Sequence, residues 1–139
     1  MVRLVVYAAS LLGLCVLIHS MGTVAMARVY KSRAVPSDAV RLHQPLLRLA
    51  VGFVLVFFLH ILEMLVWAGA YVSLGAIGGL EEALYFSIVS FTSVGYGDVV
   101  LPPDWRILGA SEAAAGMLMF GWSVGLLVIL IERVTKQLV

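Results

Sequence analysis

Three long apolar runs, separated by polar segments, dominate the chain. They cover residues 4–27, 49–74 and 107–131. Each is longer than the roughly 20 residues that an α-helix needs to cross the hydrocarbon core of a bilayer. A fourth apolar run, residues 80–91, is too short to span and suits a re-entrant half-helix buried by protein. The pattern predicts an all-α membrane protein with three transmembrane helices and one short helix that enters the membrane and returns.

The composition agrees with this class of protein. Of the 139 residues 63% are hydrophobic and 12% are charged, and the mean hydropathy is +1.08. A soluble domain of this size cannot cover so much apolar surface with so few charges. We therefore expect residues 1–139 to form a single membrane domain, with an N-terminal transmembrane helix over 4–27, a cytoplasmic linker over 28–45 and a larger unit over 46–139.

The basic residues predict how the chain sits in the membrane. Those that flank or occupy the first connection are Arg28, Lys31, Arg33, Arg41 and Arg48. Arg133 and Lys136 follow the third span. The positive-inside rule then places the linker over 28–48 and the C-terminus in the cytoplasm, and the N-terminus outside a multi-pass cell-membrane protein. Because topology accounts for these charges, they give no indication of nucleic-acid binding.

The first apolar run has a second interpretation, a secretory signal. Arg3 precedes it, and the small residues Ala25 and Ala27 imitate a cleavage site. Cleavage would leave the basic stretch that follows on the outside, against the charge rule, so a transmembrane helix is favoured. Cys15 is the single cysteine and excludes an intrachain disulfide.

The segment between the short helix and the third span carries the most specific chemistry. It reads Thr92, Ser93, Val94, Gly95, Tyr96, Gly97 and Asp98. A cation that leaves water needs oxygens to replace its hydration shell, and successive backbone carbonyls supply them if they face one axis. Gly95 and Gly97 can adopt positive φ at little steric cost, and Val94 and Tyr96 then point outward. An ordinary tight turn is the alternative, but the place between a short helix and a span favours an ion pathway.

These residues resemble the selectivity filter of potassium channels, and the order of helices over 46–139 resembles their minimal pore module. The resemblance implies K⁺ ions bound at Ser93, Val94, Gly95 and Tyr96, with Thr92 supporting the filter entrance and no cofactor besides the permeant ions. It also implies a homotetramer in the lipid bilayer. Geometry requires the same, because one chain supplies oxygens on only one side of an ion. The helix over 4–27 is additional to this module.

The function implied is a potassium-selective channel that conducts passively. No span has arginines at three-residue spacing, so no voltage sensor is indicated and leak-like or membrane-modulated gating is expected. Ser93 stands where the family commonly has threonine, which keeps a weakly selective cation channel as an alternative. A non-conducting regulatory subunit is the other alternative. The chain has no Ser/His/Asp set or phosphate-binding loop, so an enzyme is not expected.

Several polar residues are candidates for supporting the filter. Asp98 follows the filter, and the resemblance implies a partner for it on the pore helix. Val89 and Phe86, at the usual places, have no donor, so Tyr85 is a candidate substitute. Glu112, near the outer end of the third span, lies behind the filter in this pattern.

Glu63 lies inside the second span, where an ionisable group is a functional candidate. We expect it to brace the filter through a pore-helix partner such as Ser87, with proton sensing as the second possibility. Gly116 in the third span is either a gating hinge or a site of close helix packing.

His19 and His60 fall at similar depths if the first two spans are antiparallel. They form either a pH-sensitive contact or two independent sites, and two ligands are too few for zinc. The remaining expectations concern the ends of elements: an outer aromatic belt at Trp67 and Tyr71, a helix cap at Asp104, and a short interfacial helix over 39–44.

Overall fold

The computed structural model describes residues 1–32 and 43–136. It contains three long helices, α1 (Val2–Ser32), α2 (His43–Ser73) and α4 (Arg106–Thr135), and the short helix α3 (Leu80–Phe91). All four predicted helices are present, and α3 has the predicted bounds. The expected interfacial helix over 39–44 falls largely outside the described residues.

The three long helices meet the length and hydropathy requirements of membrane spans, at Val2–Arg28, Leu46–Ser73 and Pro103–Thr135. A helix of 31 residues is roughly 46 Å long, against a hydrocarbon core of about 30 Å. Their ends therefore extend beyond the core, which explains why the helices are longer than the apolar runs in the sequence. The chain is a multi-pass membrane protein.

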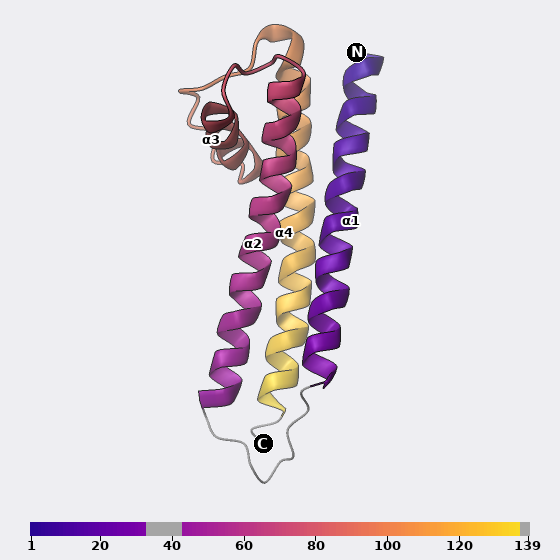
Figure 1. Cartoon of the computed structure of the whole chain (residues 1–139), viewed down its shortest axis with the longest axis vertical. Helices are drawn as coiled ribbons and strands as arrows, with labels where there is room; N and C mark the ends of the chain where they lie inside the picture. Colours follow the sequence, from indigo (N-terminus) through magenta and orange to yellow (C-terminus); the bar gives the residue numbers. More distant parts are fainter. Residues whose placement is uncertain (33–42, 137–139) are drawn as a thin grey trace.

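The long helices lie side by side, and α3 packs at one end of the bundle (Figure 1). It contacts α2 and α4, whereas α1 packs on α4 and α2 at the side away from α3. The N-terminus of α1 lies at the same end as α3, and α4 ends at the opposite end. The segment between α2 and α4 thus leaves from one end of the bundle and returns to it.

Aromatic residues at this end fill the core. Trp67 and Tyr71 are fully buried, and Tyr71 meets Phe86 of α3 edge to face at 5.2 Å between ring centroids. The predicted aromatic belt at these two residues is therefore wrong. Their rings are used to seat α3 on α2, because a large apolar ring gains more from packing there than from the interface.

Asp104 does not cap α4. It lies in a short 3-10 helix, η2 (Pro103–Trp105), which leads directly into α4, and Trp105 takes the cap position without a side-chain hydrogen bond. The turn of 3-10 helix tightens the entrance of α4, so the predicted cap was wrong. By contrast Glu81 and Glu82 occupy the first turn of α3, where their charges favour the positive end of its dipole.

Helices α3 and α4 approach each other closely at Gly116. A methyl group built on Gly116 would overlap the carbonyl oxygen of Phe91, the last residue of α3. Neither backbone can retreat without breaking helix contacts, so this position requires glycine. Gly121 and Gly125 have nothing within 4 Å of the same hypothetical methyl group.

This difference gives a test of the packing. Replacing Gly116 with alanine should destabilise the protein by about 1–3 kcal/mol, the usual cost of overpacking a core. The matched change Gly121→Ala should leave the midpoint of thermal unfolding unchanged or raise it, because alanine favours a helix by up to about 1 kcal/mol. Thermal unfolding of both purified variants measures this, and equal midpoints would contradict the close contact.

Candidate functional site

The segment after α3 is held by the end of that helix. Four consecutive backbone N–H groups turn back and donate to the last carbonyls of α3. The pairs are Thr92 to Ile88 at 3.1 Å, Ser93 to Ser90 at 2.9 Å, Val94 to Val89 at 3.1 Å and Gly95 to Val89 at 3.2 Å. The last turn of α3 thus satisfies the donors of the segment and fixes where it begins.

Backbone conformation alternates along the segment. Ser93, Gly95 and Gly97 have φ of 60°, 60° and 79°, whereas Val94 and Tyr96 between them do not have positive φ. When left- and right-handed residues alternate, each peptide plane is rotated so that successive carbonyl groups face the same side. Positive φ at the two glycines was predicted. Positive φ at Ser93 was not, and costs about 1–2 kcal/mol in a residue with a Cβ.

The carbonyls of this segment are free to bind a ligand. Within the part of the chain that the structure describes, no hydrogen bond ends on a carbonyl of residues 93–97. Residues 93–98 are also all exposed. A row of oxygens that face one side without internal partners is chemically suited to replacing the water shell of a monovalent cation.

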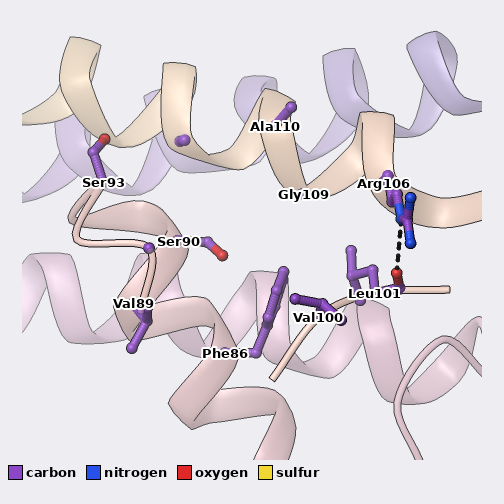
Figure 2. A pocket seen from close by; sticks show the side chains of 11 residues that line it. Phe86, Val89, Ser90, Ser93, Val100, Leu101, Arg106, Gly109 and Ala110 are labelled. Atoms are coloured by element: carbon purple, nitrogen blue, oxygen red, sulfur yellow. Dashed lines mark hydrogen bonds between the residues drawn. The ribbon is translucent and has the colours of Figure 1, made fainter. Parts of the chain in front are cut away.

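Two side chains of the segment are exposed in the single chain. Val94 is 53% exposed and Tyr96 73% exposed in the single chain. An open hollow of about 420 Å³ also lies between α3, the segment and α4, and Ser93 and Gly95 are the residues of the segment that line it. Phe86 and Ser90 line it from α3 and Gly109 and Ala110 from α4, as Figure 2 shows. In a single chain, other parts of the protein therefore leave much of the segment uncovered.

Asp98 has the partner that the sequence suggested. Tyr85 on α3 donates its hydroxyl to Asp98 Oδ2 at 2.5 Å, and the N–H of Val99 donates to Oδ1 at 3.0 Å. The tyrosine hydroxyl holds the pKa of the Asp98 carboxyl below its usual value, and the carboxylate in turn raises the pKa of Tyr85. Tyr85 therefore connects the C-terminal end of the segment to the helix that precedes it.

Glu112 joins three helices behind the segment. It is fully buried and accepts hydroxyl hydrogen bonds from Tyr71 of α2 at 2.6 Å and Ser87 of α3 at 2.5 Å. Ser87 also lies 2.8 Å from the Met64 carbonyl. These bonds place the carboxyl of α4 against α3, and the role of Glu112 in supporting the filter stays a prediction.

Glu63 contacts two histidines, whereas its expected partner Ser87 is bonded to Glu112. His19 Nδ1 lies 2.8 Å from Glu63 Oε1, and His60 Nδ1 lies 3.0 Å from Oε2. On the far side of both rings, Ser123 Oγ lies 3.3 Å from His19 Nε2 and 2.9 Å from His60 Nε2. We call His19, His60, Glu63 and Ser123 the buried polar ring. All four residues are buried, and they come from α1, α2 and α4.

The ring is a hydrogen-bonded set and not a metal centre. Potential ligand atoms of His19, His60 and Glu63 do lie within 4.8 Å of one another. Ligands around tetrahedral zinc, however, are about 3.3 Å apart, given metal–nitrogen bonds near 2.05 Å. The nitrogen–oxygen separations of 2.8 and 3.0 Å are instead those of N–H···O hydrogen bonds.

Sequence reasoning found part of this ring. The depth argument paired His60 with His19. The three-residue spacing of His60 and Glu63, which puts both on one face of α2, was a signal that the sequence analysis did not use. Ser123 was not expected in the ring, because a serine among the small residues of the third span has no distinctive pattern. Of the candidate residues, Glu112 and Asp98 lie around α3, while Glu63 belongs to the separate ring.

Comparison with known proteins supports the pore assignment. A family model described as an ion channel matches residues 48–133, which cover most of α2, all of α3, the segment that follows and most of α4. No curated protein and no solved structure matches the chain. The family implies ion permeation through a membrane-embedded protein and suggests a protein that is not an enzyme. The chain belongs to the ion-channel family, as a two-transmembrane, potassium-channel-like unit preceded by an additional apolar helix, α1.

Proposed function

We propose that the chain forms a potassium-selective channel that conducts K⁺ passively through residues 92–97. The observation that carries this proposal is the alternating φ of residues 93–97 together with their unbonded carbonyls. Ser93, Val94, Gly95 and Tyr96 bind the ions, and Thr92 and Gly97 bound the row. On this proposal α3 is a re-entrant pore helix whose partly negative C-terminal end favours a cation at the start of the row.

Four copies complete the pathway. One segment can surround an ion on one side only, and the exposed Val94 and Tyr96 need a neighbour to cover them. The hollow beside α3 is also open in the single chain. In a ring of four, neighbouring copies cover these surfaces, and the four rows of carbonyls meet at one axis.

A weakly selective cation channel is the second candidate, and Ser93 is the observation that favours it. Its hydroxyl keeps the oxygen that a threonine would offer, but it has no methyl group to fix that oxygen by packing. The residue is also exposed and holds an unfavourable φ. Greater freedom at the innermost site would weaken discrimination between K⁺ and Na⁺.

Gating by a hinge in α4 remains a proposal. Gly116 has a packing reason for being glycine, so an alanine there would change α3 contacts as well as helix bending. Gly121 and Gly125 have open space and test bending without that complication. In the absence of a voltage sensor among the spans, leak-like or membrane-modulated gating is our expectation.

Ion selectivity is the direct test of the function. Purified protein in liposomes should carry K⁺ without a partner protein, and its reversal potential should follow the K⁺ gradient when Na⁺ opposes it. A reversal potential midway between those of the two ions would identify the weakly selective channel. Absence of K⁺ flux in a correctly folded tetramer would favour the interpretation as a non-conducting regulatory subunit.

The conformation of the row can be tested at Gly95. An alanine at φ of 60° costs about 1–2 kcal/mol in each chain, and four copies share one pathway. Gly95→Ala should therefore abolish K⁺ flux while the three long helices remain folded. The matched change Gly78→Ala, outside the row and with open space around it, should conduct normally. Normal flux through Gly95→Ala would refute the assignment of the row.

The bond between Tyr85 and Asp98 makes a prediction about acid. Because the bond favours the charged carboxylate, it stabilises the outer end of the row above the ordinary pKa of Asp98, about 3.9 in peptides. This contribution is lost as the pH falls through the lowered pKa. In Tyr85→Phe the pKa of Asp98 should rise toward its ordinary value, and flux should begin to fall at a higher pH than in the wild type.

Flux against external pH measures this shift. Tyr7→Phe on α1 is the matched control and should reproduce the wild-type curve. Identical curves for all three proteins would show that the tyrosine hydroxyl does not hold the outer end of the row.

A further inference from the structure

The buried polar ring has four hydrogen bonds and therefore needs four protons. Glu63 as a carboxylate accepts from His19 Nδ1 and His60 Nδ1, which uses one proton from each histidine. On the other side Ser123 faces both Nε2 atoms. Its hydroxyl has one proton and can donate to only one of them. The other Nε2 must carry its own proton and donate to the serine oxygen.

With Glu63 as the carboxylate and all four bonds made, one histidine of the ring is doubly protonated. Moving one proton to Glu63 would give two neutral histidines with the same four bonds, and the NMR experiment below distinguishes the two arrangements. The shorter distance, from Ser123 to His60, suits donation by the hydroxyl to His60, which leaves His19 as the imidazolium. The ring then contains one imidazolium, one carboxylate and one neutral imidazole, with a net charge of zero.

Neutrality matters because the ring is inside the membrane span. Removing the extra proton leaves a net charge of −1 and breaks one bond to Ser123. Adding another gives a net charge of +1. Either charge is unfavourable in an apolar interior, so the surroundings stabilise the ring when it holds four protons.

Aromatic rings around the site suit a cation. His60 lies 4.4 Å from Phe120 and His19 lies 5.2 Å from Trp122, between ring centroids. Both pairs are tilted, at 43° and 57° between the ring planes, and aromatic rings within about 6 Å attract a positive charge that approaches their faces. Among the residues that the structure describes, the other buried titratable groups are Cys15 on α1, Tyr71 on α2 and Glu112 on α4; α3 presents Phe91 to His60.

We propose that the buried polar ring is a binding site for one proton, and that the bound proton holds α1 against α2 and α4. His19 belongs to α1 and the other three residues belong to α2 and α4, so the hydrogen bonds of the ring hold the additional helix α1 against those two helices. Without the proton, His19 Nε2 and Ser123 lose their hydrogen bond and the carboxylate loses its counter-charge. Loss of the proton at high pH therefore loosens α1.

The site also touches the base of the proposed filter. His60 packs against Phe91 at 6.0 Å between centroids, and the Phe91 carbonyl is the group that approaches Gly116. Phe91 immediately precedes Thr92. A change in the ring is thus transmitted through one side chain to the start of the row of carbonyls. This effect on conduction rests on the proposed function, whereas proton binding does not.

Histidine protonation can be measured directly by NMR of protein labelled with ¹⁵N at histidine, in lipid nanodiscs. Spectra are recorded across about pH 5 to 9, where histidine usually changes charge. At the low end of this range the wild type should show one imidazolium and one neutral imidazole coupled to each other. The imidazolium should disappear in a single step as the pH rises. Two neutral rings throughout this range, or spectra that change when a chelator removes metal, would overturn the proposal.

Variants separate the proton site from a merely structural cluster. In Glu63→Gln the carboxylate is gone, so the imidazolium signal should be lost at neutral pH. In Ser123→Ala the doubly protonated ring loses its acceptor, and the step should move to lower pH. The controls are Glu132→Gln and Ser111→Ala, whose side chains are exposed on α4 and bonded locally. They should leave the step in place, and a step that survives in Glu63→Gln refutes the site.

Attachment of α1 is read from thermal unfolding of the same samples. The wild-type midpoint should fall as the pH rises through the step seen by NMR, and this dependence should be absent in Glu63→Gln even if that variant is less stable. If the unfolding midpoint of the wild type does not change with pH across the NMR step, the bound proton does not hold α1 against α2 and α4. Flux over the same pH range then tests the coupling to conduction. A protein without K⁺ flux but with the NMR step would refute the channel proposal and leave the proton site intact.

Discussion

The end of α3 controls the rest of the pore unit, because its last carbonyls must be satisfied inside an apolar bundle. They accept the N–H groups of residues 92–95, and this sets the direction in which the following carbonyls face. The same helix end touches α4 at Gly116, where only a hydrogen atom fits. Any residue that displaced the end of α3 would therefore rotate the row of carbonyls as well. In lipid there is no water to repair such a displacement, which makes the constraint strict.

Two buried carboxylates hold different sets of helices together. Glu112 joins α2, α3 and α4 through hydroxyl donors, at the end of the bundle where α3 lies. Glu63 joins α1 to α2 through histidines. Because hydrocarbon offers no hydrophobic drive between helices, polar contacts and close packing specify which helices associate. The two sets of donors respond differently to pH. Hydroxyl groups keep their protons over the physiological pH range, whereas imidazole can gain or lose one.

Much of the fold could be predicted from the sequence, since the length of apolar runs fixes the number of spans and the bounds of α3 follow from its short run. Local rules also identified positive φ at Gly95 and Gly97 and the donor Tyr85. What could not be predicted depends on contacts between helices. Ser93 adopts positive φ because its neighbours are held on both sides, and Trp67 and Tyr71 are buried because α3 covers them. The partners of Glu63 depend on the rotation of α1 and α4, which periodicity alone does not specify.

The left-handed serine has a consequence for how the pathway is maintained. A backbone that holds a strained residue and leaves its oxygens without protein partners is incomplete by itself, and on our proposal the permeating ion completes it. The ion is then a structural component as well as cargo. By mass action, the folded state of residues 93–97 would become more populated as the ambient K⁺ concentration rises, so the organism's ionic composition would help to determine the stability of its own conduit.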